Sequence, residues 1–476
     1  MRFDLELLDF VECDIDSDKL AVSGSNRDLS WREFKEEVKK QKKKILSYNL
    51  PQGHPIIIYG HKEVEFIVNI VACMSLKMPY IPVDTIYPKE RVKKIINITK
   101  SALFINSISN EIEFNSTFKE TSYSREDQII YIIFTSGSTG EPKGVQITKS
   151  SILNFAIWLR NDFNFSNKNI FMNQAPFSFD LSVYELIGFL LFGGSIILNS
   201  RELINNPSYF LKNLQSYKCN TWVSTPSFIS RFLLSKDFNS ENLKNLTQFI
   251  FCGELLPSAT VKKILMNFPN KTVINSYGPT EATVATTMVR IDEKVLNQYT
   301  KLPVGYVKEG TEIRILNKNE EGIGEIQIIG DNVSIGYFKN EKLNKEKFSI
   351  VNGKRAFKTG DYGYFKDEML FFAERKDDLI KMHGFRIETT EIDNVILKNT
   401  AVKDSITIPL KRGNSVIKLI TFIVSFEIDL DNLRNKISKE LPYYMIPSDI
   451  IQLEKLPYNA NHKIDKKKLI EIYKGL

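Results

Sequence analysis

Short runs of apolar residues recur through the first half of the chain, bounded by turn-forming residues. Runs of this length and composition are typical of buried strands. They occupy residues 55–60, 80–84, 131–134, 221–226 and 249–254. Apolar residues after the first run recur at helical spacing (66–71), and residues 29–34 begin an amphipathic helical pattern. Strands that alternate with helices in this way predict an α/β fold, in which parallel or mixed sheets are flanked by helices.

The pattern changes near the C-terminus. Residues 406–408 and 420–424 are β-rich, and residues 430–441 have a helical pattern. The dense charge run at 374–378 follows an apolar strand pattern and is typical of a solvated linker. Because 476 residues are too many for one ordinary core, two or more domains are expected. We predict a large N-terminal domain at 1–375 and a small, mobile α+β lid at 376–476.

The composition, 42% hydrophobic and 25% charged, is that of a soluble globular protein. The net charge of +7 is modest for this length, and the dense lysine run at 39–44 continues an acidic–basic helical pattern from Trp31. We interpret that run as the solvated face of a helix. Nucleic-acid binding is therefore weakly supported, although a basic face would suit an acidic protein partner.

The cysteines at 13, 73, 219 and 252 show neither metal-ligand spacing nor a dense disulfide framework. The N-terminus carries two early acids and lacks the apolar core of a signal peptide. The longest apolar run, 181–198, contains Glu185 and three glycines, and it falls short of a membrane span. These features predict a reduced, cytoplasmic compartment without membrane insertion.

The strand at 131–134 leads directly into a loop, Thr135 to Gly144, that is dominated by Gly, Ser and Thr. Its glycines let successive N–H groups point at one spot, and its hydroxyls and Lys143 add further donors and a positive charge. This is the chemistry of a polyphosphate cradle. It is not a Walker A loop, because Gly144 follows Lys143. A lone Gly/Ser run is as often a plain surface loop, but the preceding strand and the terminal Lys favour phosphate binding.

The loop resembles that of the adenylate-forming superfamily, which comprises acyl- and aryl-CoA ligases, luciferases and nonribosomal peptide adenylation domains. Five further blocks resemble the family in the same order, and the likeness extends over residues 29–466. It implies an enzyme that uses ATP and Mg²⁺ to join a carboxylate to AMP and then passes the acyl group to a thiol. Such catalysis needs no protein nucleophile and depends on positioning and electrostatics.

The resemblance also assigns roles to residues. Tyr277 would stack on adenine, Thr280 would contact the α-phosphate, and Glu281 would help to hold Mg²⁺. Asp361 would accept hydrogen bonds from both ribose hydroxyls, and Lys463 would bridge the substrate carboxylate and the α-phosphate. The catalytic residues implied are thus Thr280, Glu281 and Lys463. The ATP-binding residues implied are Thr135, Ser136, Gly137, Ser138, Thr139, Gly140, Lys143, Asn275, Tyr277, Gly278, Thr280, Asp361, Arg375 and Lys463.

Asp180 precedes a strongly apolar helix at 184–192. From the residues alone, an acid at this place is more often an N-cap. Its block resembles amino-acid adenylation domains, in which the matching carboxylate binds the α-ammonium of the substrate. A buried carboxylate needs a cationic partner, and an amino acid supplies one. Ligases for fatty or aromatic acids normally lack this carboxylate.

The family's substrate pocket corresponds here to small, apolar or hydroxylic side chains with no charge beyond Asp180, which suits a small neutral amino acid. These positions are Asp180, Tyr184, Ser224, Ile250, Cys252, Ser276, Val284 and Ala285. Residues 251–254 and 282–285 resemble the ligases that charge carrier proteins with D-alanine for teichoic acid, in which a Cys at the position of Cys252 favours the D-enantiomer. Residues 184–188 look more like a peptide-synthetase domain, so a stand-alone enzyme for another small amino acid is the alternative. An acyl-CoA ligase is a further one.

The resemblance places a pivot for lid rotation at Asp377 and a pantetheine channel at Gly384. It implies a phosphopantetheinylated carrier protein, supplied as a separate chain, as the partner that accepts the aminoacyl group. The chain departs from the family where Glu374 and His462 replace glycines, which puts the local backbone at both places in question.

Overall fold

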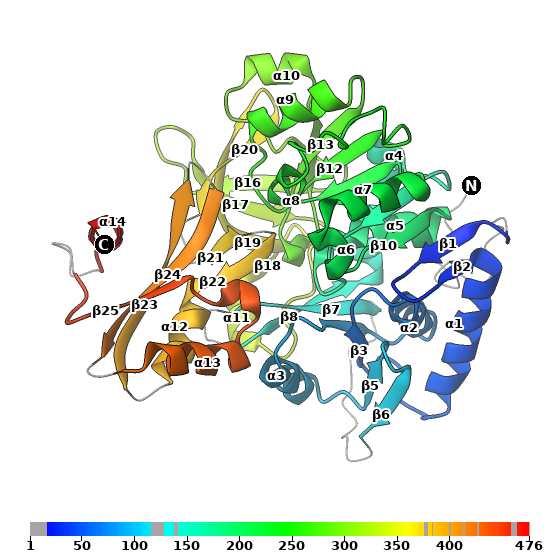
Figure 1. Ribbon diagram of the computed structural model, residues 1–476, viewed down its shortest axis with the longest axis horizontal. Coiled ribbons are helices and arrows are strands. Elements are labelled where there is room, and N and C mark those ends of the chain that lie inside the picture. The colour runs from blue at the N-terminus through cyan, green and yellow to red at the C-terminus, as the bar shows by residue number, and fades with distance from the viewer. Residues whose placement is uncertain are drawn as a thin grey trace. The chain divides into compact units, whose positions relative to one another are not determined.

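The computed structural model describes residues 17–115, 128–137, 141–375, 379–382, 384–398, 401–412, 415–425, 428–457 and 464–475 (Figure 1). The chain divides into two compact units. Unit 1 comprises Met1–Thr85, Thr99–Ile133 and Gly144–Lys376, and unit 2 comprises Ile86–Ile98, Phe134–Lys143 and Asp377–Leu476. Two segments from the first 375 residues thus belong to the same unit as the C-terminal part. The lid boundary at 375/376 stays a prediction.

The first sheet of unit 1 carries most of the site. Its strands are β1 (Leu20–Ser23), β2 (Asp28–Ser30), β9 (Ile170–Asn173), β10 (Ser195–Leu198), β11 (Thr221–Ser224), β12 (Gln248–Phe251), β13 (Thr272–Tyr277), β14 (Thr287–Arg290) and β15 (Tyr306–Val307). They lie in the order β15-β14-β13-β12-β11-β9-β10-β1-β2. The neighbours from β1 to β13 pair in parallel, whereas β2, β14 and β15 pair antiparallel.

Two more sheets complete unit 1. The second contains β3 (Ile56–Gly60), β4 (Tyr80–Asp84), β5 (Leu103–Asn106), β6 (Glu111–Phe114), β7 (Ile129–Thr135) and β8 (Lys143–Thr148), in the order β6-β5-β3-β4-β7-β8. The third contains β16 (Glu312–Leu316), β17 (Gly324–Ile329), β18 (Phe348–Val351), β19 (Lys354–Lys366) and β20 (Met369–Arg375). It is antiparallel, with the order β16-β17-β19-β18 and β20 paired to β19.

Several helices of unit 1 begin at a residue whose side chain caps the helix. In α1 (Trp31–Leu46), Ser30 and Glu33 form a capping box, which satisfies two backbone donors at once. The lysines of its outer face are exposed or half-buried, as predicted. The other helices are α2 (Val64–Ser75), α4 (Lys149–Phe163), α5 (Val183–Phe192), α6 (Arg201–Asn205), α7 (Pro207–Ser216), α8 (Pro226–Ser230), α9 (Ser258–Asn267), α10 (Glu293–Gln298) and α11 (Glu341–Lys347), with the 3₁₀ turns η2 (Asp180–Ser182) and η3 (Thr280–Ala282).

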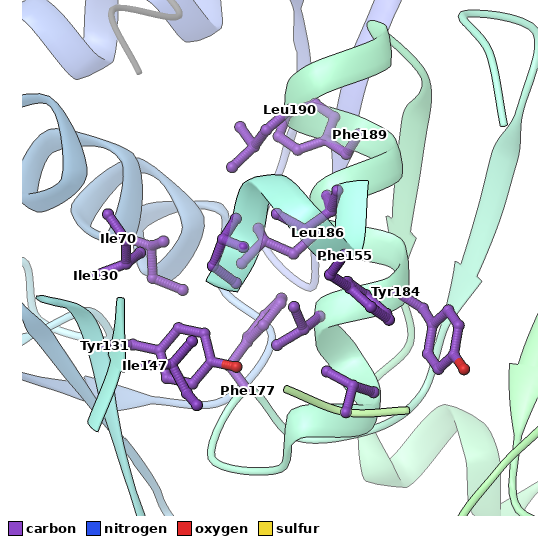
Figure 2. Close-up of a cluster of buried hydrophobic side chains, with 14 of the residues drawn as sticks. Ile70, Ile130, Tyr131, Ile147, Phe155, Phe177, Tyr184, Leu186, Phe189 and Leu190 are labelled. Carbon is purple, nitrogen blue, oxygen red and sulfur yellow. The ribbon is translucent and has the colours of Figure 1, made fainter. Parts of the chain in front are cut away.

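Successive side chains of β12 enter two different cores. Ile250 belongs to a cluster that also contains side chains of α2, β7, β8, α4 and α5, whereas Phe249 and Phe251 belong to a second cluster with Trp222. This alternation is the period of two that a strand imposes. Figure 2 shows part of the first cluster, where Tyr184 lies at the edge with its hydroxyl directed away from the apolar side chains.

Unit 2 contains an antiparallel hairpin, β21 (Leu379–Met382) with β22 (Phe385–Glu388), and a sheet made of β23 (Val402–Arg412), β24 (Ser415–Ser425) and β25 (Asp449–Leu453). Its helices are α3 (Lys89–Thr99, all but the last residue), α12 (Thr389–Leu397), α13 (Leu430–Glu440) and α14 (Lys466–Gly475), with a 3₁₀ turn at η4 (Tyr443–Met445). Figure 1 shows α12 and α13 side by side, and the two are in contact. A small core around Ile420, Phe422 and Leu469 holds this unit together.

The predicted fold class is confirmed: a mixed α/β architecture with a small α+β part at the C-terminus. The strand predicted at 80–84 is β4 to the residue, and the helix predicted at 184–192 is α5 with one more residue at its start. Among the described residues, no helix combines the length and apolarity needed to cross a bilayer.

Candidate active site

The pocket residues gather because three parallel strands end at one edge of the sheet. Ser224 of β11 is in register with Phe251 of β12, which in turn pairs with Asn275 of β13. The carboxyl ends of neighbouring parallel strands form the usual ligand-binding crevice of open α/β sheets. Cys252 and Ser276 each follow one of these paired residues. The edge therefore brings Ser224, Cys252 and Ser276 together, as the resemblance predicts.

Hydrogen bonds fix this edge. Tyr184 Oη lies 2.9 Å from Ser276 Oγ, which donates to the carbonyl of Phe251 at 2.8 Å. Trp222 Nε1 donates to Ser224 Oγ at 2.7 Å, and that hydroxyl donates to the Thr225 carbonyl at 2.9 Å. Burial, followed by the nearby Cys252, raises the pKa of Tyr184 well above its usual value. The pocket floor is therefore neutral near pH 7.

The backbone at 283–284 closes the pocket in an unusual conformation. Thr283 and Val284 have φ values of 56° and 68°, which β-branched residues rarely adopt and which store roughly 1–3 kcal/mol of strain each. The carbonyl of Val284 accepts from Cys252 Sγ at 3.8 Å. Opposite it, a Cβ on Gly278 would meet Ala285 Cα at 2.5 Å, so this turn requires glycine. Ile250 and Ala285 are fully buried in the wall.

Asp180 is half-buried at the first position of η2. It lies close enough to Tyr131 and Tyr184 to raise the pKa of both hydroxyls, although burial is the larger cause for each. The helix α5 has Ser182 at its N-cap position, so Asp180 does not cap that helix. The cap interpretation is thus not supported, and one of the two tyrosines near Asp180, Tyr184, is a predicted pocket residue.

A buried polar cluster anchors the segment that leads to Asp180. Lys62 Nζ donates to the Ala175 carbonyl at 2.6 Å and also to Asn173 Oδ1. Asn173 in turn donates to Glu185 of α5. Burial lowers the pKa of Lys62 to about 7, and burial raises the pKa of Glu185. The cluster holds both ends of the 173–185 segment against α2 and β3.

The Asp361 carboxylate is held between β13 and β20. Tyr277 Oη donates to Asp361 Oδ2 at 2.7 Å, and Arg375 Nη1 donates to Asp361 Oδ1 at 2.6 Å. Asp361 and Arg375 are cross-strand partners of β19 and β20. A carboxylate has about four acceptor positions, so each oxygen keeps capacity for another donor such as a ribose hydroxyl. Burial, then Asp361, raises the pKa of Tyr277, which keeps its hydroxyl a donor.

Glu281 lies in η3 beside Thr280, and both are buried. Tyr337 Oη donates to Glu281 Oε1 at 2.7 Å, and Ser334 N donates to the Glu281 carbonyl at 2.8 Å. Within the described ranges, no group of three or more His, Cys, Asp or Glu side chains could hold a metal by itself. Mg²⁺, however, is commonly held by one or two carboxylates together with water and substrate phosphates, and Glu281 fits that mode. Asn275 Nδ2 donates to the Pro303 carbonyl at 2.7 Å, which fixes the start of this turn.

In unit 2 the described ends of the loop bind groups of the C-terminal segment. Ser136 Oγ donates to the Arg386 carbonyl at 2.9 Å, and Lys143 Nζ lies 2.7 Å from Glu388 Oε1. Gly137 N donates to Glu391 Oε2 at 3.2 Å. Thr135 ends β7. Gly384, in the turn between β21 and β22, has φ 84°, a conformation that favours glycine.

Five predicted residues lie outside the described ranges: Ser138, Thr139, Gly140, Asp377 and Lys463. Sequence reasoning missed Tyr131, Tyr337, Glu388 and Glu391. Tyr131 reads as a core residue of a strand, and its hydroxyl is buried without a hydrogen-bond partner in the structure. Glu388 and Glu391 follow Gly384 in the block 381–388 and just beyond it, so two acids three residues apart were the available signal.

The profile of the family described as AMP-binding enzyme matches residues 12–338. The chain belongs to this family. A curated AMP-binding enzyme of Bacillus licheniformis, named D-alanine–D-alanyl carrier protein ligase, is 37% identical over 95% of this chain and 96% of its own length. A protein of the same name from Bacillus anthracis is 35% identical over the same shares of the two chains.

Solved structures of other proteins share the fold. An adenylation domain of Vibrio cholerae, in complex with glycyl-adenosine-5'-phosphate, aligns with a TM-score of 0.85 at 19% identity, over 99% of this chain and 97% of its own. A nonribosomal peptide synthetase protein with adenylation and carrier domains aligns with a TM-score of 0.80 at 22% identity, over 95% of this chain and 81% of its own. At these identities the likeness establishes the architecture alone.

Proposed function

We propose that this enzyme activates D-alanine with ATP and transfers it to the phosphopantetheine thiol of a separate carrier protein. The curated relatives named for that reaction align over nearly the whole chain. The observation that carries the proposal is the pocket at the strand ends. Its predicted residues, all of which the structure describes, comprise one carboxylate, Asp180, and uncharged side chains that include Cys252 and Ser276. A small zwitterion of one ammonium group and one short side chain suits it.

In the first half-reaction, a carboxylate oxygen of the amino acid forms a bond to the α-phosphorus of ATP. The bond from that phosphorus to the bridging oxygen breaks, and pyrophosphate leaves with the electron pair. Asp180 holds the α-ammonium, Asp361 orients the ribose, and Thr280 contacts the α-phosphate. Lys463 balances the charge of the two anions as they approach. Mg²⁺, held by Glu281 and the phosphates, would supply further charge neutralisation.

In the second half-reaction, the thiol sulfur forms a bond to the acyl carbon, its proton is lost, and AMP leaves. We propose that residues 376–476 rotate about Asp377 between the two halves and that Gly384 lets the pantetheine arm pass close to the backbone. The carrier protein would be supplied in trans. We propose that the reaction takes place in the cytoplasm, where ATP is available, and that the charged carrier feeds cell-wall teichoic acid synthesis.

The deciding experiment is amino-acid-dependent pyrophosphate exchange across a panel of D- and L-amino acids. D-alanine is expected to give the highest kcat/KM. A preference for another small amino acid would favour the peptide-synthetase alternative, and exchange supported by acids without an ammonium group would favour an acyl-CoA ligase. Asp180→Ala should remove activity on alanine, because the ammonium then enters a pocket without its counter-charge. Unchanged activity would refute the role of Asp180.

Lys463→Ala separates the halves. It should abolish exchange, because the approach of two anions loses its bridging cation. Transfer from a supplied alanyl-adenylate to the carrier thiol should be largely preserved. Equal loss in both assays would contradict the role given to Lys463.

A further inference from the structure

Two carboxylates of unit 2 are bound to the loop groups that a polyphosphate would need. Lys143 Nζ forms its 2.7 Å ion pair with Glu388, and the side chains are 9% and 11% exposed. The amide of Gly137, at the other described end of the loop, donates to Glu391. A lysine ammonium and a loop amide are standard phosphate-binding groups. Here each is matched to a carboxylate oxygen, so the described part of the cradle already holds anions.

Glu391 is itself fixed by Arg91 of α3. Arg91 Nη1 lies 2.7 Å from Glu391 Oε1, and the two side chains are 3% and 2% exposed. Burial is the largest single influence and lowers the pKa of Arg91, but Glu391, Tyr444 and Tyr87 together outweigh it, so the pKa of Arg91 is raised. The Tyr87 ring lies 5.2 Å from the Arg91 guanidinium. Glu391 therefore presents one oxygen to Arg91 and the other to the loop.

The spacing of Glu388 and Glu391 at the start of α12 explains why both carboxylates reach the loop. Residues three apart at a helix start lie on one face, and Glu388 and Glu391 have that spacing. Glu388 is the N-cap residue of α12, yet its side chain accepts no capping hydrogen bond from the helix. Its carboxylate bonds Lys143 instead. A cap is thus given up for a contact with the loop, while the Arg386 carbonyl, two residues earlier, accepts from Ser136.

We infer that Glu388 and Glu391 are positioning residues that compete with polyphosphate for the described ends of the loop, Gly137 and Lys143. ATP or pyrophosphate on the loop would displace the two carboxylates, and loss of pyrophosphate would let them return. The start of α12 would then be tied to the loop only when the loop carries no phosphate. This links the departure of pyrophosphate to the placement of the 385–397 segment for the second half-reaction. The inference rests on the proposed function, because it takes the loop as the polyphosphate site.

The test uses the full-length protein and Glu388→Gln, which keeps the shape of the side chain and removes its charge. The first measurement is the dissociation constant of magnesium pyrophosphate by calorimetry. Close charge pairs in proteins couple strongly enough that removing the competing anion should tighten binding about tenfold. The second is single-turnover transfer of alanine from a supplied adenylate to the carrier thiol, which should slow about threefold or more, on the same grounds. Tighter pyrophosphate together with slower transfer is the expected signature.

Glu90→Gln is the matched control. Glu90 lies in α3 next to Arg91, and its side chain pairs with the exposed Lys93 and not with the loop. It should leave both measurements unchanged. If Glu388→Gln does not fold, Glu388→Asp retains the charge one methylene further from Lys143 and should shift both quantities in the same directions by less. Unchanged or weakened pyrophosphate binding in the folded variants would overturn the inference. Absence of amino-acid-dependent exchange in the unmodified enzyme would instead overturn the proposed function.

Discussion

Two buried carboxylate–cation arrangements in this enzyme differ in how they are built. Asp361 and Arg375 sit opposite each other on paired strands, 14 positions apart in the chain. Glu388 and Glu391 meet Lys143 and Arg91 across 245 and 300 positions. The first pair is set by the register of one sheet. The second depends on which segments of unit 2 pack together, and we propose that a polyphosphate can replace its two carboxylates.

The same contrast distinguishes the proposed substrate pocket from the contacts of the loop, which the proposed mechanism requires to change. The proposed amino-acid pocket lies at strand ends whose hydroxyls are hydrogen-bonded within unit 1, an arrangement that would preorganise it for one small substrate. The loop ends are satisfied by groups of a segment that the proposed mechanism requires to move. A preformed pocket is suited to selecting the substrate, and an exchangeable contact is suited to ordering two half-reactions.

Removing Arg91 should have the largest effect. Arg91→Met leaves the Glu391 carboxylate nearly fully buried without its cationic partner, and breaking a buried pair in this way typically costs about 3–5 kcal/mol of unfolding free energy. Arg314→Met is the control, because Arg314 and Glu312 form an exposed pair of the kind that contributes little to stability. Urea denaturation followed by circular dichroism measures both. Equal losses would mean that the remote pair is no more demanding than a surface one.

Asp361→Ala tests the local pair. It removes the acceptor for Tyr277 and Arg375 and, in the proposed mechanism, for the ribose, so exchange should fall about 10²–10³-fold, as for loss of one preorganised polar contact. Asp367→Ala is the matched control, since Asp367 also accepts from a tyrosine, Tyr299 at 2.5 Å, in the turn after the same strand. Its kcat/KM should stay unchanged. A comparable loss in both variants would assign the effect to the sheet and not to the site.

Lowering the pH should reduce the stability of unit 1, because the buried histidine His54 resists protonation in the folded protein. Burial, followed by Lys339, lowers the pKa of His54 to about 4, and Ala102 N donates to His54 Nε2 at 2.8 Å. Between pH 6.5 and 4 the unfolded chain binds a proton that the folded protein does not, so stability is lost as the pH falls through this window. The loss from pH 6.5 to 5 is about 2 kcal/mol from this group.

His54→Gln keeps an acceptor for Ala102 and removes the titration. Urea titrations at pH 8, 6.5, 5.5 and 5 should give a smaller pH slope for the variant than for the unmodified protein, with the difference confined to the acidic side. Parallel slopes throughout would show that His54 does not carry the loss.

The sequence predicts the strand-borne part of this site better than the loop-borne part. Cys252 lies at the end of an apolar run that the sequence identifies as a strand, and the parallel pairing of β12 with β13 then brings it to the same edge as Ser276. Glu281 and Asp361 were predicted through motifs, but Tyr337, which donates to Glu281, was not, because it lies 56 positions away in no recognisable pattern. Glu388 and Glu391, which bind the loop, were missed for the same reason. Tertiary packing brings them to partners that are hundreds of residues away, and local periodicity does not encode such contacts.

Cys252 offers the finest test of the preformed pocket. Its sulfur is buried 3.8 Å from the Val284 carbonyl, so Cys252→Ala opens a space of about one methylene-sized group in the wall. A difference of that size in an apolar pocket is worth about tenfold or somewhat more in kcat/KM. We therefore expect the preference for D- over L-alanine to fall about tenfold. Cys219→Ala, in the core cluster on the other side of the sheet, creates a similar cavity away from the pocket and should lower stability while leaving the preference intact. If both variants kept the same preference, the hand of the substrate would have to be set by the hydroxyls of Tyr184 and Ser276 and not by the sulfur.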